Sequence, residues 1–366
     1  MKISIVPFTS ELEAAAARFN ARMHDARAPT AFLLPERSHA TTRHGEVTVT
    51  HYVACDEQGD VRGGMLCHEY PAHVAGRTAR VLNISAPLSE GIIDPAYTWV
   101  GSLLIKHALR ENPLAFVVGM GGPDKPLPRL LRAMRWTVSV VPFYFRMLNA
   151  GRCAQELAPF RASRGRRFAA SIAATTGIAA IGALALHRAS REAANAAREF
   201  TVDAITEWDT VAEPWNAFVP RTTFAVERTP GVLPFFYPLN RSGFQVWAMK
   251  RSTVPVGWFG LAITRMSANP YFGDLTVAVL TDCVGTTEAV QAGPMLAIER
   301  AKAAGAELLI TNQQHQELQT GCVRAGWRAA PSNYLLATSP TLSTQLRSET
   351  TYLTRRDGDG LVNLIA

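Results

Sequence analysis

The sequence repeats itself once, with an offset of 192 residues between two matching glycines (293 − 101). Gly101 and Gly293 each begin an apolar, helix-like run, and 17 residues later a strand-like run ends, at Val118 and Ile310 respectively. Aromatic and proline positions recur further on, in the pairs Trp136 and Trp327, Pro142 and Pro331, and Tyr144 and Tyr334. A long period that occurs twice indicates duplicated domains, because a solenoid is built from shorter and more numerous units.

The length of the chain supports this division. At 366 residues it exceeds the size at which one core usually keeps growing, and two domains of about 150 residues lie in the common range. An apolar fraction of 48% with 18% charged residues is typical of a globular protein and excludes wholesale disorder. We predict an N-terminal domain over 1–157, a basic and apolar helical linker over 158–197, a C-terminal domain over 198–349 and a tail over 350–366.

Both halves show the same order of apolar patterns, an antiparallel meander followed by a helix, a strand, a helix and a strand. In the first half the predicted elements are strands at 47–54, 63–69 and 80–85, a helix at 100–110, a strand at 114–118, a helix at 127–134 and a strand at 138–148. In the second half they are a hairpin at 244–249 and 256–263, a strand at 275–280, a helix at 293–304, a strand at 307–311, a helix up to 326 and a strand at 332–337. The order predicts an α+β fold in which each half has a mixed, mostly antiparallel sheet flanked by helices.

The charge and the segment between the halves bear on partners and location. A net charge of +7 favours an anionic partner, such as a nucleotide-bearing cofactor, RNA or an acidic membrane surface, with an ordinary basic surface as the alternative. The uncharged segment 168–186 follows several arginines, and we weigh a helix packed between domains, a helix on the inner leaflet and a true span. Five cysteines without a CxxC pair, and an N-terminus too short in apolar residues for a signal, predict a cytoplasmic protein. As an alternative, the cytoplasmic protein associates with the inner face of the membrane through 168–186.

The recurring order resembles the GNAT acyltransferase fold, and the pair of domains resembles the double-GNAT arrangement of FemAB-like transferases, over about 1–148 and 200–337. In that family the fourth strand splays from the fifth to bind the pantetheine arm, and the next helix presents its N-terminal amides to the cofactor pyrophosphate. The resemblance implies acyl-CoA, for example acetyl-CoA, as the cofactor, without a metal. The implied cofactor-binding residues are Val100, Gly101 and Ser102 in the first half and Gly293 in the second.

The family's phosphate signature is only partly present. It has Arg or Gln, two residues, Gly, one residue, and then Gly or Ala, and each half keeps the last glycine alone. In the first half Trp99 takes the place of the first glycine and would crowd a phosphate, whereas in the second half Glu288 would repel it. We therefore expect acyl-CoA in the first half rather than the second, and close packing of a helix on a strand is the alternative reading of Gly101 and Gly293.

Amine acylation needs a base for the amine proton and an acid for the leaving thiolate. In the first half the candidates are Glu90, at the end of a predicted strand, and Tyr144, which alternation places on the opposite face from its neighbouring phenylalanines. In the second half Asp282 and His315 follow predicted strands. The alternatives are a solvated strand end for Glu90, an ordinary core or surface position for Tyr144 and a helix cap for His315.

Further polar residues of the second half are candidates for substrate binding, because in a GNAT-like frame they meet where the strands splay. They are Asn312, Gln313, Asn333 and Tyr334. The chain contains no Walker A sequence, HExxH, GxSxG or dinucleotide fingerprint.

The resulting hypothesis is an enzyme, an N-acyltransferase that moves an acyl or aminoacyl group from a small-molecule donor to an amine of a sugar or cell-envelope precursor. Two alternatives stay open. One is a catalytically inactive GNAT-like scaffold with decayed cofactor sites, and the other is a tRNA-dependent transferase whose net positive charge binds RNA.

Overall fold

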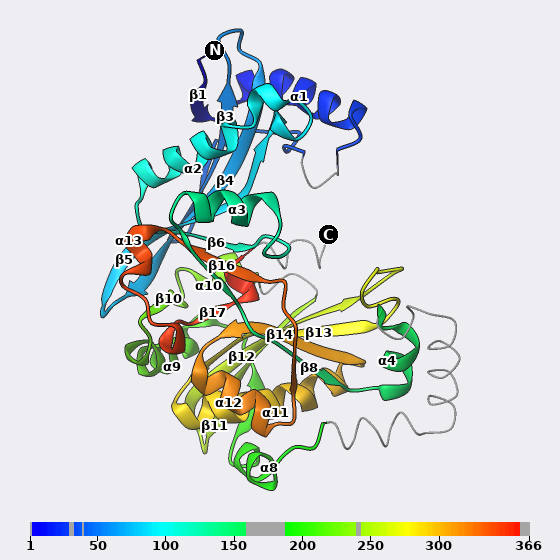
Figure 1. Ribbon diagram of the computed structural model, residues 1–366. Coiled ribbons are helices and arrows are strands. Elements are labelled where there is room, and N and C mark those ends of the chain that lie inside the picture. The colour runs from blue at the N-terminus through cyan, green and yellow to red at the C-terminus, as the bar shows by residue number, and fades with distance from the viewer. Residues whose placement is uncertain (1, 29–32, 39, 159–186, 239–242, 359–366) are drawn as a thin grey trace. The chain divides into compact units, whose positions relative to one another are not determined.

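The computed structural model describes residues 2–28, 33–38, 40–158, 187–238 and 243–358. The chain divides into two compact units (Figure 1). Unit 1 consists of Met1–Val140 and Leu335–Leu346, and unit 2 of Val141–Tyr334 and Arg347–Ala366. Each unit therefore takes its residues from two separate stretches of the sequence.

Unit 1 is a mixed sheet with the strand order β1-β3-β4-β5-β6-β16-β7 and with β2 beside β3. Its strands are β1 (Ser4–Pro7), β2 (Thr41–His44), β3 (Val47–Cys55), β4 (Val61–Val74), β5 (Arg77–Ser89), β6 (Ala115–Gly119), β7 (Thr137–Val140) and β16 (Leu335–Thr338). Its helices are α1 (Glu13–Asp25), α2 (Val100–Glu111), α3 (Pro126–Ala133) and α13 (Pro340–Ser343). Neighbouring pairs along this path are antiparallel except β5 with β6.

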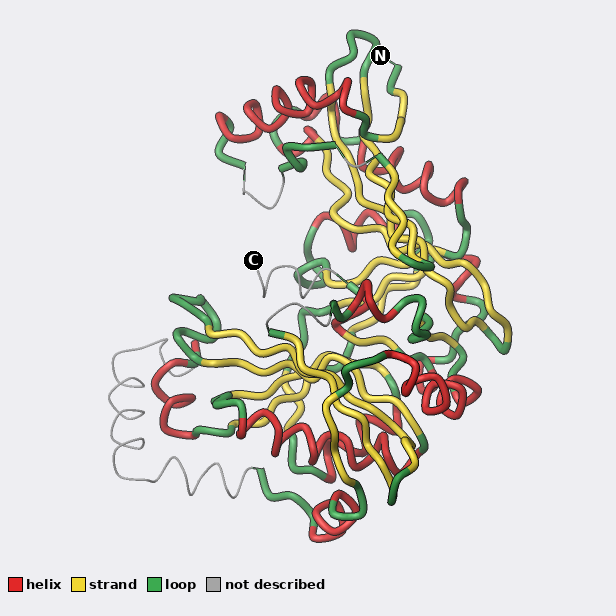
Figure 2. Tube along the Cα trace, turned by 180° about the vertical axis from the view of Figure 1, so that it is seen from behind, coloured by secondary structure: helices red, strands yellow, loops and turns green. Residues whose placement is uncertain are grey.

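Helices cover both faces of this sheet because successive strand residues point to opposite sides. Val53 of β3 packs in the core that contains Phe19 of α1, whereas the next residue, Ala54, packs in the core that contains Leu104 of α2 and Leu131 of α3. Figure 2 shows these helices along the strands of unit 1. The first turn of the N-terminal helix is a 3-10 turn without a side-chain cap.

Unit 2 repeats this plan with the strand order β15-β8-β14-β13-β12-β11-β9. Its strands are β8 (Phe143–Met147), β9 (Thr201–Ala204), β10 (Phe224–Val226), β11 (Phe244–Arg251), β12 (Val254–Arg265), β13 (Thr276–Gly285), β14 (Leu308–Gln314), β15 (Arg328–Ala330) and β17 (Leu353–Thr354). Its helices are α4 (Ala150–Glu156), α8 (Arg191–Ala197), α9 (Ala212–Phe218), α10 (Leu233–Phe236), α11 (Thr287–Ala303) and α12 (Gln316–Arg324). The parallel pair is again an inner one, β13 with β14. The predicted fold class, a mixed sheet flanked by helices in each of two domains, is confirmed.

The units exchange one strand each. β16, from the second half of the sequence, lies between β6 and β7 of unit 1, and β8, from the first half, lies between β14 and β15 of unit 2. The predicted strand 138–148 is thus two strands in different units, β7 and β8. The predicted strand 332–337 and the residues before it are divided in the same way, into β15 of unit 2 and β16 of unit 1. The break includes Pro142 in one case and Pro331 in the other, because proline gives no backbone donor to a ladder and restricts the residue before it.

The boundaries of the compact units therefore differ from those of the predicted domains. The predicted boundary at 157 and the range 198–349 keep each half of the sequence together, whereas the contacts join 335–346 to the first half and 141–157 to the second. Helix α8, from the predicted linker, packs on α11 in unit 2, and residues 351–357 of the predicted tail belong to the same unit. The rest of the linker, including 168–186 with its three membrane-related readings, lies outside the described residues.

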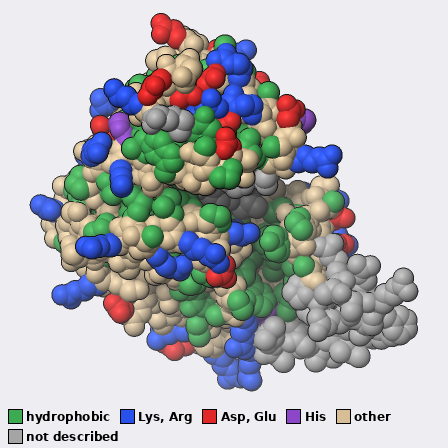
Figure 3. Space-filling model, turned by 45° about the horizontal axis from the view of Figure 1, so that its top comes forward, with side chains coloured by type: hydrophobic (Ala, Val, Ile, Leu, Met, Phe, Trp, Pro, Cys, Tyr) green, Lys and Arg blue, Asp and Glu red, His purple; other side chains and the backbone are tan. Residues whose placement is uncertain are grey.

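Three further observations concern partners and compartment. No helix within the described part of the chain is long and apolar enough to cross a membrane. All five cysteines are free and buried. On the face shown in Figure 3, Lys and Arg side chains are spread over the surface and alternate with Asp and Glu.

Strand exchange makes a prediction about fragments. Residues 1–148 produced alone lack β16, so β6 and β7 lose the strand that pairs with both, and we expect no cooperative unfolding. Val140 lies directly opposite Leu335 in the antiparallel ladder, so a two-residue Asn-Gly turn can join them. We expect the chain 1–140, Asn-Gly, 335–346 to unfold cooperatively in urea, followed by circular dichroism. A cooperative transition for the fragment 1–148 would contradict the prediction.

Candidate functional site

The two parallel strands of unit 2 separate after three paired positions. β13 and β14 pair from Val277 with Leu308 to Val279 with Ile310, and no later pair joins them among the described residues. The Thr311 hydroxyl donates to the Leu280 carbonyl at 2.8 Å, and Thr281 is the extra residue of a bulge against β12. A bulge bends its strand, so the two strands form a wedge at the position where the GNAT resemblance implies a cofactor arm.

The chain's own C-terminal segment fills this wedge. On one side β17 pairs with β14, with Thr354 opposite Gln313. On the other side the Tyr352 hydroxyl accepts a hydrogen bond from the Cys283 amide at 3.0 Å and donates to Asp282 Oδ1 at 2.8 Å. The backbone groups that the splayed strands would offer to a pantetheine arm therefore already have partners in unit 2.

Asp282 is the centre of a buried polar network rather than a residue at a cleft. Its carboxylate is 1% exposed and accepts hydrogen bonds from Arg228 Nε at 3.0 Å and Nη2 at 3.2 Å. The hydroxyls of Tyr237 and Tyr352 donate to it as well, at 2.5 and 2.8 Å. Burial, and then the nearby carboxylate, raise the pKa of both phenols well above the ordinary value. This geometry gives Asp282 a structural role and argues against the predicted catalytic one.

The same arginine also holds the tail. Arg228 Nη2 donates to Asp357 Oδ1 at 2.7 Å, and both side chains are buried. Asp357 Oδ2 in turn accepts from the Thr354 amide at 2.8 Å, which closes a capping box around the turn Arg355–Asp357. Burial raises the pKa of the Asp357 carboxyl, and the Arg228 charge opposes that rise. Sequence reasoning missed Arg228, Tyr237, Tyr352 and Asp357, because they are spread over 130 residues (357 − 228 + 1) and form no motif.

His315 is a buried ring and not a helix cap. It occupies the N-cap position of α12 but its side chain makes no capping bond. The ring lies 5.1 Å from the Phe218 ring and 5.9 Å from the Tyr352 ring, and Nδ1 has no hydrogen-bond partner among the described residues. Burial lowers the pKa of His315 to about 4, so the imidazole is neutral at pH 7.

The predicted substrate-binding residues lie around the same wedge but differ in exposure. Asn312 is buried and its Nδ2 donates to Ser332 Oγ at 3.1 Å. Gln313 is fully buried, and neither of its amide atoms has a partner among the described residues. Asn333 is exposed, whereas Tyr334 is buried with the Arg355 guanidinium 5.6 Å from its ring centre. The segments thus converge as expected, but on the C-terminal segment.

Tyr144 lies in unit 2 and not in a cleft of unit 1. It belongs to β8, opposite Thr311 on one side and Ala329 on the other. Its hydroxyl is 3.5 Å from Gln319 Oε1, and burial raises its pKa. The exchange of β8 explains why a residue from the first half of the sequence serves the second sheet.

Unit 1 has a comparable wedge, in which no segment of the described part of the chain pairs with the separated edge of β5. β5 and β6 pair at Leu82 with Ala115 and at Asn83 with Phe116, and no further strand pairs with β5 on that side among the described residues. Beyond this point β5 continues to Ser89, and Ala86 with Pro87 forms a bulge against β4. Ala86 has a φ of 43° and is exposed. The edge of β5 after Asn83 therefore has no strand partner among the described residues.

Helix α2 begins next to this strand. Trp99 is its N-cap residue, and the indole is 40% exposed with Nε1 donating to the Ala96 carbonyl at 2.9 Å. A Cβ added at Gly101 would meet nothing closer than 3.8 Å. Ser102 donates from Oγ to the Trp99 carbonyl at 2.7 Å, and Val100 is buried. A Cβ at Gly101 would therefore make only ordinary van der Waals contacts, with Leu130 and Ser89.

Gly293 occupies a different environment. It lies inside α11, seven residues after the N-cap Thr286, so its amide belongs to the body of the helix (293 − 286). A Cβ at this position would collide with Cys283 Sγ. The geometry supports the alternative that this glycine serves close packing of the helix on β13.

Glu90 follows β5 and is held by two arginines. Its carboxylate accepts from Arg22 Nε at 2.6 Å and Nη2 at 3.1 Å, and from Arg62 Nη1 at 3.1 Å. The side chain is 4% exposed. Because two guanidinium groups hold this carboxylate, the geometry favours a role in positioning the turn before α2.

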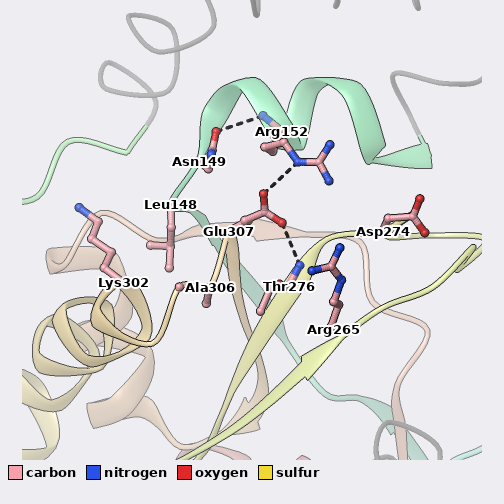
Figure 4. Close-up of a pocket in the computed structure, with 10 residues that line it drawn as sticks. Leu148, Asn149, Arg152, Arg265, Asp274, Thr276, Lys302, Ala306 and Glu307 are labelled. Carbon is pink, nitrogen blue, oxygen red and sulfur yellow. Dashed lines mark hydrogen bonds and ion pairs between the residues drawn. The ribbon is translucent and has the colours of Figure 1, made fainter.

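A separate cavity of about 580 Å³ lies at the opposite end of β13 and β14 (Figure 4). Glu307 accepts there from Arg152 Nε and from the Thr276 amide, both at 3.0 Å. Arg265 and Lys302 also line it. No motif of the sequence marks this cavity. Among the described residues no cluster of His, Cys, Asp or Glu could hold a metal ion.

The buried network makes a prediction about stability. Arg228→Met leaves the Asp282 and Asp357 carboxylates buried without their cation, and we expect a loss of about 3–5 kcal/mol in the free energy of unfolding. Arg324→Met, which removes an exposed ion pair with Glu192, is the matched control and should cost less than about 1 kcal/mol. Urea denaturation measures both. Equal losses for the two variants would contradict the network's role.

The pKa of His315 makes a prediction about pH. Because its pKa is lower in the folded chain than the ordinary 6.5, protons bind the unfolded chain more readily. The neutral His315 ring therefore contributes fully to the free energy of unfolding above pH 6.5, and this contribution falls by about 3 kcal/mol as the pH drops to 4. We expect His315→Phe to flatten this decline in urea denaturation at a series of pH values, whereas the exposed control His24→Asn should not. An unchanged slope for His315→Phe would show that the ring is protonated in the folded chain.

Comparison with known proteins places the architecture. No protein-family model and no curated protein sequence matches the chain. Among solved structures, N-myristoyltransferase of Saccharomyces cerevisiae with bound myristoyl-CoA is similar, with a TM-score of 0.53 and 12% identity over 96% of this chain and 80% of the other. A GCN5-related N-acetyltransferase of Anabaena variabilis has a TM-score of 0.50 and 9% identity over 98% of this chain and 86% of the other.

A third similar structure is a GCN5-related glucosamine N-acetyltransferase region of a fungal multi-domain GH3 β-N-acetylglucosaminidase. Its TM-score is 0.52 and its identity 12%, over 92% of this chain and 38% of the other. At such low identity the likeness concerns the fold alone. The wedge between two parallel strands, the helix that follows and these neighbours agree, so the chain has a GNAT-like fold.

Proposed function

We propose that the protein is an N-acyltransferase that binds one acyl-CoA per chain, in unit 1, and transfers the acyl group to an amine. The observation that carries this proposal is the contrast between the two wedges. In unit 1 the edge of β5 beyond Asn83 has no strand partner among the described residues, whereas in unit 2 Tyr352 and β17 occupy the wedge. Unit 2 then serves as a scaffold, as in a duplicated enzyme that keeps one working copy.

The residues of unit 1 fit an acyl-CoA. The free edge of β5 offers backbone donors and acceptors to the amides of a pantetheine arm. The first amides of α2, at Val100, Gly101 and Ser102, suit a pyrophosphate, since a helix start carries unpaired N–H groups and a positive dipole end. Gly101 has no side chain that could hold a phosphate away from the backbone. The cofactor supplies a thioester, and these groups of the chain hold it in place.

Amine acylation also requires two proton transfers besides the binding of the cofactor. The amine loses a proton as it attacks the thioester carbonyl, and the thiolate leaves with one. In our proposal Glu90, with Arg22 and Arg62, positions the turn that leads into α2, so that the helix start faces the end of β5. Asp282, His315 and Tyr144 belong to unit 2 and take no part in these proton transfers.

For the acceptor we propose an amine of a sugar or cell-envelope precursor. Two points support this class, the resemblance to double-GNAT transferases and the name of the fungal neighbour, a glucosamine N-acetyltransferase region. The yeast neighbour, which contains bound myristoyl-CoA, adds that a similar fold binds a long-chain acyl-CoA. Acetyl-CoA and myristoyl-CoA are therefore the two donors to compare.

An acidic residue at the start of α2 tests the cofactor site. Gly101→Asp fits without a clash and suits a helix start, so the fold should be kept, but its charge repels a pyrophosphate. We expect the wild-type chain to bind one acyl-CoA, with acetyl-CoA and myristoyl-CoA compared by calorimetric titration. The dissociation constant should rise at least tenfold in the variant, or about 1.4 kcal/mol.

The matched control is Gln316→Glu, which adds one negative charge at the exposed start of α12 in unit 2. It should leave acyl-CoA binding unchanged. Two equivalent sites per chain would contradict the closed wedge of unit 2. No binding of either donor by the wild-type chain would favour the alternative, a scaffold protein without a cofactor.

A further inference from the structure

The turn Arg355–Asp357 of unit 2 contains a guanidinium that has no anionic partner among the described residues. Arg355 forms no ion pair and no side-chain hydrogen bond with any described residue, and its Nε is buried without an acceptor. The side chain as a whole is partly buried. Burial lowers the pKa of this guanidinium, and the Tyr334 phenol is the group that opposes the shift. A cation in such surroundings is costly unless an anion joins it.

The other two residues of the same turn already have their partners. Asp357 pairs with Arg228, and the Arg356 guanidinium lies 4.5 Å from the Phe244 ring centre and 5.1 Å from that of Tyr237. The capping box between Thr354 and Asp357 fixes the backbone on both sides of Arg355. The unpaired guanidinium is therefore held in place before any ligand arrives, which lowers the entropy cost of binding one.

Its neighbours are suited to a polar ligand. The Arg355 guanidinium lies 5.6 Å from the Tyr334 ring centre, so one face of its plane is covered. The residue before it, Thr354, lies opposite Gln313, whose buried amide lacks both a donor and an acceptor partner among the described residues. An arginine with a covered face presents its N–H groups as a planar fork, which matches carboxylate and phosphate oxygens.

We propose that Arg355 is the anchor of an oxyanion-binding site in unit 2, which takes the carboxylate or phosphate group of a small molecule. The fork donates two hydrogen bonds to two oxygens of the anion, and the ring of Tyr334 keeps the fork oriented. The site does not depend on acyl-CoA binding in unit 1, because its residues belong to unit 2.

The test uses the full chain and two probes, inorganic phosphate and acetate, at constant ionic strength. Binding is followed by the 15N-edited NMR signal of the Arg355 Nε–H, assigned as the signal that Arg355→Lys removes. We expect saturable shifts of this signal with at least one probe. In Arg355→Met, calorimetric titration should give a dissociation constant for that probe at least tenfold higher.

Arg251→Met is the matched control, because Arg251 also lies against an aromatic ring, Phe200, but already pairs with Glu199. It should bind the probe as the wild type does. Tighter binding of phosphate than acetate assigns a phosphorylated ligand, and the reverse assigns a carboxylate. Absence of a saturable shift with both probes in the wild type, or an unchanged dissociation constant in a folded Arg355→Met, would overturn the proposal. If Arg355→Met does not fold, the Arg355→Lys variant and the wild-type NMR signal of the Arg355 Nε–H take its place in the test of the proposal.

Discussion

The exchange of one strand between the units is the constraint on which the rest of the structure depends. β16 pairs with β6 and β7 in unit 1, and β8 pairs with β14 and β15 in unit 2, so neither sheet is complete within one half of the sequence. Each strand is an inner one, and its loss would leave two neighbours with unpaired backbone groups. A gene duplication that ends in such an exchange commits both copies to folding together.

The same requirement for backbone pairing explains how the two copies differ. Two parallel strands that separate expose N–H and C=O groups, which need a partner from the chain, from water or from a ligand. Unit 2 meets this need with its own C-terminal segment, through β17 and the Tyr352 hydroxyl. In unit 1 the edge of β5 stays without a strand partner in the described part of the chain. In our proposal, duplication allows one wedge to become structural while the other is kept for a ligand.

Much of the fold follows from apolar patterns, and the part that does not has a physical reason. The helices after Gly101 and before Gly326, and the strands around them, lie where periodicity predicts them, since local pattern sets element type. The assignment of strands to units depends on long-range pairing, which no local pattern contains. The matched prolines Pro142 and Pro331 were visible as part of the repeat, and their place at the two crossovers became clear only from the sheet order.

The candidate site shows the same division. The predicted site residues Asp282, His315 and Tyr334 are all buried in unit 2. The burial of Asp282 and His315 could not be predicted, because it depends on contacts with Tyr352 and Arg228, which belong to no sequence motif. A carboxylate in a polar cluster suggests a base when its surroundings are unknown. Once two tyrosines and an arginine donate to it, the same carboxylate becomes a fixed acceptor that ties a tail to a sheet.

Two arginines of unit 2, Arg228 and Arg355, differ in whether carboxylates of the described chain compensate their charge. Arg228 is wholly buried but has two carboxylates, so its charge is compensated within the chain. Arg355, two residues before Asp357, has an aromatic ring and no carboxylate in the described part of the chain. Because an uncompensated cation destabilises the folded state, its retention in an ordered turn is best explained by an anion that binds there. The C-terminal segment would thereby close one ligand site in this unit and create another.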